Sequence, residues 1–314
     1  MPKKMLKKHG DILPIILILI SMFLITMTLQ SNFWSVSNFQ VLARQLAPYV
    51  FIAMAQTMVL LLGGMDMALG SLVSFANVMF ASTLGHGALD LITILGILAL
   101  CMVMSAISGL VVYWFKLPAI VVSLAFSFIW SGVALRVMSV PGGHIPNTVV
   151  GPLTANIGGV LPAPLLLIVL FIAFWYLVKR TSMGVLIYAV GNNREGAFTS
   201  GLPVLKAYLF SYCFSGLMIG MAALLLSAIT TSGDPNIGGP LTINSVTAAV
   251  LGGVAFSGGK GKMIGSVVGG MVVGMLVNVL FYLRVPGHYT YVVEGGILIF
   301  AVAANLIRER GKRA

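Results

Sequence analysis

The sequence predicts an all-α membrane protein with about ten transmembrane helices and both termini in the cytoplasm. Of its 314 residues, 59% are apolar and only 8% are charged, whereas soluble domains average about 25% charged residues. The apolar residues form runs of about 15 to 25, the length of a membrane helix and not of the ten-residue alternating strands of a membrane barrel. This composition cannot build a water-facing surface of ordinary size, so a soluble protein is excluded.

The expected spans follow the apolar runs in order. The first run is too long for a secretory signal and no small-residue cleavage site follows it, so we interpret it as a retained helix. The ten runs cover residues 12–30, 41–62, 71–85, 91–115, 118–138, 163–178, 207–230, 242–256, 263–283 and 291–307. We expect one transmembrane domain over residues 1–314, with cytoplasmic tails at 1–11 and 308–314.

The basic residues indicate how this domain is oriented. If the N-terminus is cytoplasmic, ten spans return the C-terminus to the same side and assign every loop a side. Fifteen of the eighteen Lys and Arg residues then lie inside, and only Arg44, Arg136 and Arg284 lie outside. Such an excess is typical of cytoplasmic loops. The net charge of +11 therefore reflects topology, and nucleic acid is not an expected partner.

Two loops are longer than a connection requires. The outer loop, Pro141–Pro162, contains four prolines and five glycines, which suits either a docking surface or a rigid connector. The inner loop, at about residues 179–206, mixes both charges with Asn, Ser and Gly. A simple connector does not need so many residues.

The sequence contains no signature of an enzyme. The histidines are scattered without metal-ligand spacing, and no Gly-x-Ser-x-Gly motif is present. Cys101 and Cys213 lie in apolar runs and indicate neither a disulfide nor a metal site. Residues 253–261 are similar to a phosphate-binding loop, but Val254 stands at the position of its first glycine and Gly261 at that of its Ser or Thr. We expect no catalytic residue, metal or cofactor in this chain.

Asp66 is an acid between two apolar runs. Gly63, Gly64 and Gly70 surround it and should break the helix, which frees backbone groups to face protein or a water-filled cavity. Acids at such a depth usually pair or line a pathway. Asp66 therefore either caps the helix that starts near Gly70 or contacts a transported solute.

Glycines also recur at helical spacing on the ninth run. Small residues at this spacing let another helix approach closely. The expected packing residues are Gly252, Gly253, Gly265, Gly269, Gly270 and Gly274.

Three segments carry a resemblance to a known family. Residues 63–70, Gly-Gly-Met-Asp-Met-Ala-Leu-Gly, resemble its motif Gly-Gly-x-Asp-Leu-Ser-Val-Gly. Residues 191–204 resemble its cytoplasmic loop, and residues 248–253 with 258–261 resemble its third block. In the order and spacing of these segments, the chain is similar to the permease subunits of bacterial ATP-binding-cassette sugar importers, in the branch typified by ribose, xylose and arabinose uptake.

The resemblance implies a binding-protein-dependent importer in the bacterial inner membrane. Two permease subunits, identical or paralogous, would form the path for a small sugar or sugar-like solute. Two cytoplasmic ATPases would bind ATP and Mg²⁺ and drive transport, and a periplasmic binding protein would deliver the solute. The inner loop would be the segment that couples the permease to the ATPase.

The inner loop also contains the expected coupling residues. Asn192 or Asn193 should cap a short helix that contains Glu195, and Gly196 and Ala197 should face the ATPase. The complete set is Gly191, Asn192, Asn193, Glu195, Gly196, Ala197, Ser200 and Gly201.

Two alternatives stay open. The same architecture could import a nucleoside, an amino acid or a signalling molecule. A proton-coupled secondary transporter would need no ATPase, but it would need a chain of membrane acids and histidines for proton relay, and Asp66 alone supports that poorly.

Overall fold

The computed structural model describes residues 13–30 and 33–286, with isolated helical positions between 289 and 299. This part of the chain is almost entirely helical. Its elements are α2 (Leu13–Leu29), α3 (Val36–Leu61), α4 (Leu69–Thr83), a 3-10 turn η1 (Gly87–Leu89), α5 (Asp90–Phe115), α6 (Ala119–Val137), α7 (Asn147–Thr154), β1 (Asn156–Ile157), β2 (Leu161–Pro162), α8 (Ala163–Lys179), α9 (Ser182–Asn192), α10 (Arg194–Thr199), α11 (Val204–Thr230), α12 (Gly239–Leu251) and α13 (Met263–Tyr282).

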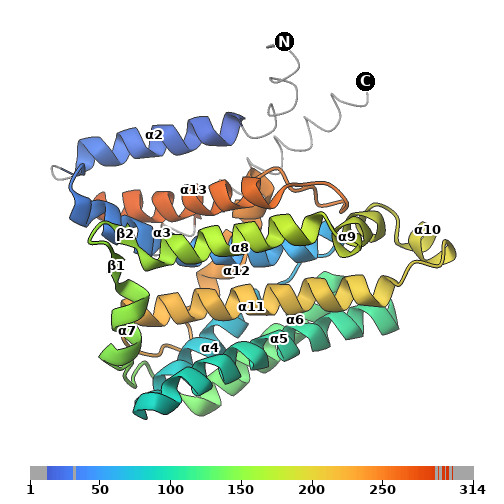
Figure 1. Cartoon of the computed structure of the whole chain (residues 1–314), viewed down its shortest axis with the longest axis horizontal. Coiled ribbons are helices and arrows are strands. Elements are labelled where there is room, and N and C mark those ends of the chain that lie inside the picture. The colour runs from blue at the N-terminus through green and yellow to red at the C-terminus, as the bar shows by residue number, and fades with distance from the viewer. Residues whose placement is uncertain are drawn as a thin grey trace.

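The central helix of the bundle is α3. It packs against α8, α11, α12 and α13, and every residue from Leu46 to Leu61 except Tyr49 is buried. Helix α2 lies at one edge of the molecule against α13, whereas α4, α5 and α6 form the opposite edge (Figure 1). The apolar core therefore runs between neighbouring helices along the whole bundle, as expected when the outer helices face lipid.

Several helices have the length and composition of membrane spans. Among the described residues these are Gly87–Phe115, α6, α11 and α13, and α8 with α9 makes a fifth if this pair, bent by 79°, counts as one span. Helices α2, α4 and α12 are apolar but shorter. The chain is thus an all-α membrane protein.

Nine of the ten predicted spans coincide with a helix, and their ends differ by a few residues. Most of the tenth, 291–307, lies outside the described residues, as do both predicted tails, 1–11 and 308–314. The expected span 242–256 ends early, at Leu251, because Gly252 and Gly253 terminate α12. Both long loops also contain structure of their own: α7 and the β1–β2 hairpin in one, and α9 and α10 in the other.

These two loops lie at opposite ends of the bundle. In Figure 1, α7, β1 and β2 are at the left end, and α9 and α10 are at the right end. At the left end, Gly142 and Gly233 exchange two backbone hydrogen bonds of 2.9 and 2.8 Å. These bonds join the α6–α7 connection to the α11–α12 connection, and the predicted topology places both connections on the same side of the membrane. The structure therefore has the two-ended arrangement that the charge pattern requires.

Candidate functional site

Helices α4 and α12 are too short to cross a bilayer. Their 15 and 13 residues correspond to about 22 and 20 Å at 1.5 Å per residue, against a hydrocarbon core of about 30 Å. Their first turns meet, because the backbone of Gly70 lies against that of Gly238. Each helix is consequently a half-span whose N-terminus points into the interior of the bundle.

Short polar side chains bridge the two half-spans. The Gly70 N–H donates to Thr242 Oγ1 at 3.1 Å, and the Gly238 N–H donates to Ser74 Oγ at 2.9 Å. Backbone N–H groups near a helix N-terminus have no intrahelical acceptor. A hydroxyl of each half-span thus accepts a hydrogen bond from one such N–H of the other. These two bonds fix the position at which the helices meet.

The segment that leads into α12 follows α4 from the left end of the bundle. Asn77 Oδ1 accepts a 2.7 Å hydrogen bond from the Asp234 N–H, and Asn77 Nδ2 donates to Ser227 Oγ at 2.7 Å. Asn236 and Gly239 are exposed and Thr242 is half-buried. The segment therefore carries polar groups into the bundle and leaves part of them accessible.

This second break was not predicted from the sequence. The signal was present, because Asp234-Pro-Asn and Gly238-Gly-Pro240 interrupt the apolar pattern as residues 63–70 do. What the sequence could not indicate is that the two breaks meet.

Asp66 lies in the irregular segment between α3 and α4 and is buried. Its Oδ1 accepts a hydrogen bond of 2.8 Å from the Ala68 N–H. The helix begins at Leu69, and its N-cap residue is Ala68, which provides no side-chain cap. Asp66 therefore holds the turn that leads into α4, two residues ahead of the N-cap position, which differs from the predicted direct cap.

The backbone of Asp66 is held as well. With its amide oriented to satisfy both groups, Gln56 of α3 donates to the Asp66 carbonyl and accepts from the Asp66 N–H, both at 3.2 Å. Ser123 Oγ of α6 accepts from the Met67 N–H at 2.9 Å and donates to the Met65 carbonyl at 3.2 Å. Side chains of neighbouring helices thus replace the missing helical hydrogen bonds, as non-helical backbone at membrane depth requires.

Helices α3 and α12 end in the same way. Gly63 and Gly253 follow the helix ends with positive φ angles of 81° and 82°, and the next residue donates its N–H five residues back, at 3.0 and 3.1 Å. This is the Schellman arrangement, in which glycine adopts the left-handed conformation at low cost. Gly253 was predicted as a packing residue; the structure places it in this turn.

The three segments that carry the family resemblance meet at the right end of the bundle. The Gly259 N–H donates to the Leu61 carbonyl of α3 at 2.9 Å. A Cβ on Gly191, near the end of α9, would collide with this carbonyl, and one on Gly258 would lie 2.7 Å from the Gly63 nitrogen. The end of α3, the end of α9 and the 258–259 turn therefore form one junction, in which glycine is required by close approach.

The inner loop at about residues 179–206, which the resemblance implies is a coupling segment, continues from this junction. Asn193 Oδ1 accepts a hydrogen bond of 2.9 Å from the Gly196 N–H, so Asn193 caps α10, and Asn192 is the exposed last residue of α9. Glu195 lies in the first turn of α10 and is exposed. Gly201, with a φ of 74°, ends the turn. The end of α9 and the capped start of α10 thus define the backbone geometry of this segment.

One expectation for the coupling segment is wrong. Ala197 was expected to face outward with Gly196, but it is only 6% exposed, whereas Phe198 is 66% exposed. Ala197 belongs to the main apolar core. The side of α10 that carries Ala197 therefore packs against the rest of the chain. Ser200 is exposed, and its Oγ bonds to the Gly196 carbonyl at 2.7 Å. The large apolar residue that α10 exposes is therefore Phe198.

The glycines of α13 face two helices where one was expected. Gly265 and Gly269 lie against the backbone of α12, with Gly252 opposite Gly265. Gly270 and Gly274 lie against α3. Both approaches are too close for a Cβ. These glycines therefore let α13 pack tightly against α12, which follows the second break, and against α3, which precedes the first.

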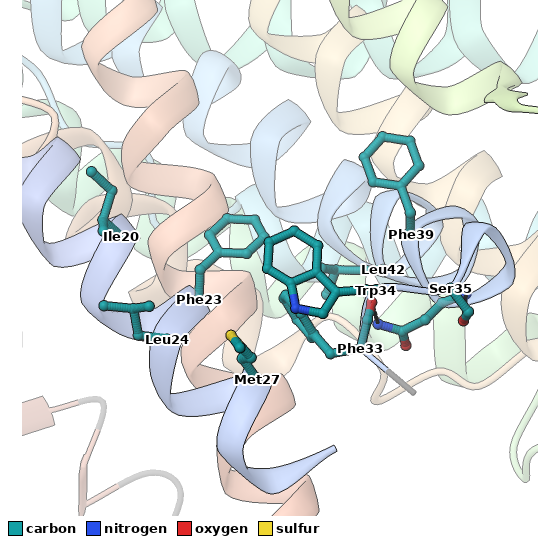
Figure 2. Close-up of a pocket in the computed structure, with 10 residues that line it drawn as sticks. Ile20, Phe23, Leu24, Met27, Phe33, Trp34, Ser35, Phe39 and Leu42 are labelled. Carbon is teal, nitrogen blue, oxygen red and sulfur yellow. Dashed lines mark hydrogen bonds between the residues drawn. The ribbon is translucent and has the colours of Figure 1, made fainter. Parts of the chain in front are cut away.

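An apolar cavity of about 360 Å³ lies at the edge of the bundle between α2 and α3. Figure 2 shows its wall of aromatic and aliphatic side chains, among them Phe23, Trp34 and Phe39. No charged residue lines it, and a polar solute would lose its hydrogen bonds to water there without replacement.

Among the described residues, no group of three His, Cys, Asp or Glu side chains lies close enough to hold a metal ion.

Comparison with known proteins identifies the family. The sequence profile of the family described as "Branched-chain amino acid transport system / permease component" matches residues 38–302. The ribose import permease protein RbsC of Escherichia coli (strain K12) is 29% identical over 298 residues, which cover 91% of both chains. No solved structure matches the chain.

Two further relatives are import permeases for other sugars. The fructose import permease protein FrcC of Rhizobium meliloti is 29% identical over 93% of this chain and 84% of its own. The D-allose transport system permease protein AlsC of Escherichia coli (strain K12) is 28% identical over 87% of this chain and 84% of its own.

Proposed function

Because this chain belongs to the permease family whose profile it matches over residues 38–302, we propose that it forms the membrane path of an ATP-driven importer for a small sugar. The observation that carries the proposal is the similarity, over most of the chain, to permeases named for ribose, fructose and allose. It favours a sugar over a nucleoside, an amino acid or a signalling molecule. The importer lies in the bacterial inner membrane.

The chain works in this proposal as one part of a larger complex. It pairs with a second permease, either identical or a paralogue, and receives its solute from a periplasmic binding protein. Cytoplasmic ATPases bind ATP with Mg²⁺ and hydrolyse it, and this chain contributes neither a catalytic residue nor a cofactor. Residues 1–314 form one domain of about ten spans with both termini in the cytoplasm, which the fifteen-to-three distribution of basic residues supports.

The solute path runs past the meeting of α4 and α12. Sugar hydroxyls need hydrogen-bond partners in place of water, and the polar groups of Thr242, Asn236 and Ser71 lie at this point and are at least partly accessible. A half-span can move without breaking a full transmembrane helix, which suits a gate.

The coupling segment is well connected to this path. Helices α9 and α10 and the start of α11 form the right end of the bundle (Figure 1), and Gly191 of α9 lies against the Leu61 carbonyl at the end of α3. The segment that contains Asp66 begins directly after α3. A displacement of α10 by an ATPase would therefore reach the break between α3 and α4 through α9 and its backbone contact with the end of α3.

Uptake in cells tests the proposed cargo. A strain that lacks this chain is supplied with the wild-type chain or with none, and uptake of labelled ribose, fructose, allose, a nucleoside and leucine is measured. We expect uptake of at least one sugar, and of neither other class, to depend on the chain. Dependence of nucleoside or leucine uptake alone would refute the assignment to sugars.

A further inference from the structure

A polar cavity lies at the same end of the bundle as the coupling segment. Its volume is about 320 Å³, at the lower end of the roughly 300–1,000 Å³ of small-ligand sites. Four parts of the chain line it: the end of α3, the end of α5 with the turn into α6, the first residue of α10 and the start of α11. The lining residues are Leu62, Gly63, Gly64, Val112, Lys116, Leu117, Pro118, Ala119, Arg194, Tyr208 and Tyr212.

Two cationic residues, one exposed and one half-buried, line this cavity without an acid. Lys116 and Arg194 belong to its wall, and none of the lining residues is Asp or Glu. The buried Asp66 lies two residues after Gly64 and acts electrostatically on Tyr212 of the wall, but it is not a wall residue itself, and its carboxylate is bonded to the Ala68 N–H. The charged groups of the wall are therefore both hydrogen-bond donors, which matches an anion.

Arg194 is held in position before any ligand binds. Its Nη2 donates to the Tyr113 carbonyl at 2.9 Å, and its guanidinium lies 5.7 Å from the centre of the Tyr113 ring and 5.0 Å from that of Tyr208. A guanidinium carries five N–H donors, so the bond to the Tyr113 carbonyl and the contact with the Tyr208 hydroxyl leave donors for a ligand. A fixed guanidinium loses less conformational entropy on binding than a free one.

Lys116 occupies an unusual backbone position. It ends α5 with a left-handed φ of 53°, a conformation that is unfavourable for a residue with a Cβ. The cationic side chain is favourable at a helix C-terminus, and topology favours a basic residue anywhere in this turn. Neither reason explains why Lys116 lines the same cavity as Arg194. A binding site for an anion would explain it.

We infer that the cavity between Lys116, Arg194, Tyr208 and the Gly63–Gly64 turn binds a phosphate-bearing anion. The phosphate is that of an anionic lipid headgroup or of a soluble phosphate compound, since both present the same oxygens to the two cations. Such a ligand touches the first residue of α10 and the turn that leads to Asp66, so it ties the coupling segment to the break in the membrane. The site does not depend on which solute the chain carries.

The test compares anions on the full-length chain. In a non-ionic detergent, the thermal unfolding midpoint is followed as inorganic phosphate replaces chloride at constant ionic strength. In nanodiscs, lipid retained by the chain is counted by native mass spectrometry with phosphatidylcholine alone and with added phosphatidylglycerol. The variants are Lys116→Asn, whose side chain tolerates the left-handed conformation, and Tyr208→Phe, which keeps the ring beside Arg194. Lys206→Asn removes an exposed cation outside the cavity wall and is the matched control.

The wild type should bind one of the two probes, and Lys116→Asn should weaken that binding by about tenfold or more, since a hydrogen bond to a charged group contributes about 1.5–3 kcal/mol. Tyr208→Phe should weaken it less, and Lys206→Asn should leave it unchanged. A response to phosphate identifies a soluble ligand, and selective retention of phosphatidylglycerol identifies a lipid. The inference is overturned if neither probe binds the wild type, or if Lys206→Asn weakens binding as much as Lys116→Asn.

Discussion

Gly70 of α4 and Gly238 before α12 touch backbone to backbone, and a Cβ on either would collide with the carbonyl of the other. This contact joins the two half-spans at their first turns. Because the helices on both sides are buried, neither backbone can move aside easily.

We therefore predict that Gly70→Ala destabilises the chain by about 1–3 kcal/mol, the usual cost of overpacking, and reduces solute uptake. Gly132→Ala in α6 is the matched control, since a Cβ there meets nothing within 4 Å. Unfolding midpoints in detergent and uptake by cells measure both effects. Equal behaviour of the two variants would show that the contact is unimportant.

Asp66 is predicted to act through the turn that it holds. Asp66→Asn keeps an oxygen that can accept the Ala68 N–H and should retain folding and most uptake. Asp66→Ala leaves that donor without its partner and should cost about 1 kcal/mol or somewhat more. Unfolding midpoints and uptake are measured on both variants. If Asn abolished uptake and left stability and ATPase activity normal, Asp66 would contact the solute directly.

Phe198 is the predicted docking residue of the coupling segment. Phe198→Asp should leave the fold intact, because the ring is exposed, and should weaken capture of the ATPase by about tenfold or more if the ring fills a partner pocket. Ile157→Asp changes a comparably exposed apolar residue at the other end of the bundle. Pull-down of the ATPase compares the two variants, and an equal loss in both would contradict docking at α10. Ala197→Trp is not a suitable probe, because Ala197 is buried and the larger ring would disrupt α10 itself.

The topology predicts opposite labelling of the two long loops. In a variant without Cys101 and Cys213, single cysteines replace Asn147 in α7 or Thr199 in α10, both exposed positions. A membrane-impermeant maleimide should label position 147 from the periplasmic side and position 199 only after the membrane is opened. Labelling of both from outside would refute the proposed orientation.

The sequence predicted the features that the membrane imposes on each run separately. Apolar length located nine helices, and the glycines beside Asp66 located the break after α3. The cap formed by Asn193 was foreseen because it depends on residues three apart. The approach of Gly70 to Gly238 was not foreseen, since it depends on packing between segments distant in the chain. For the same reason the sequence did not show that Ala197 faces the core and Phe198 faces outward.

The most direct test of the proposed function is the energy source of uptake. Inner-membrane vesicles that contain this chain with its ATPase and binding protein are loaded with ATP, and uptake of labelled sugar is followed with the proton gradient intact and collapsed. Uptake should require ATP and persist without the proton gradient. Uptake that stops when the gradient collapses and continues without ATP would contradict the assignment and indicate a proton-coupled transporter.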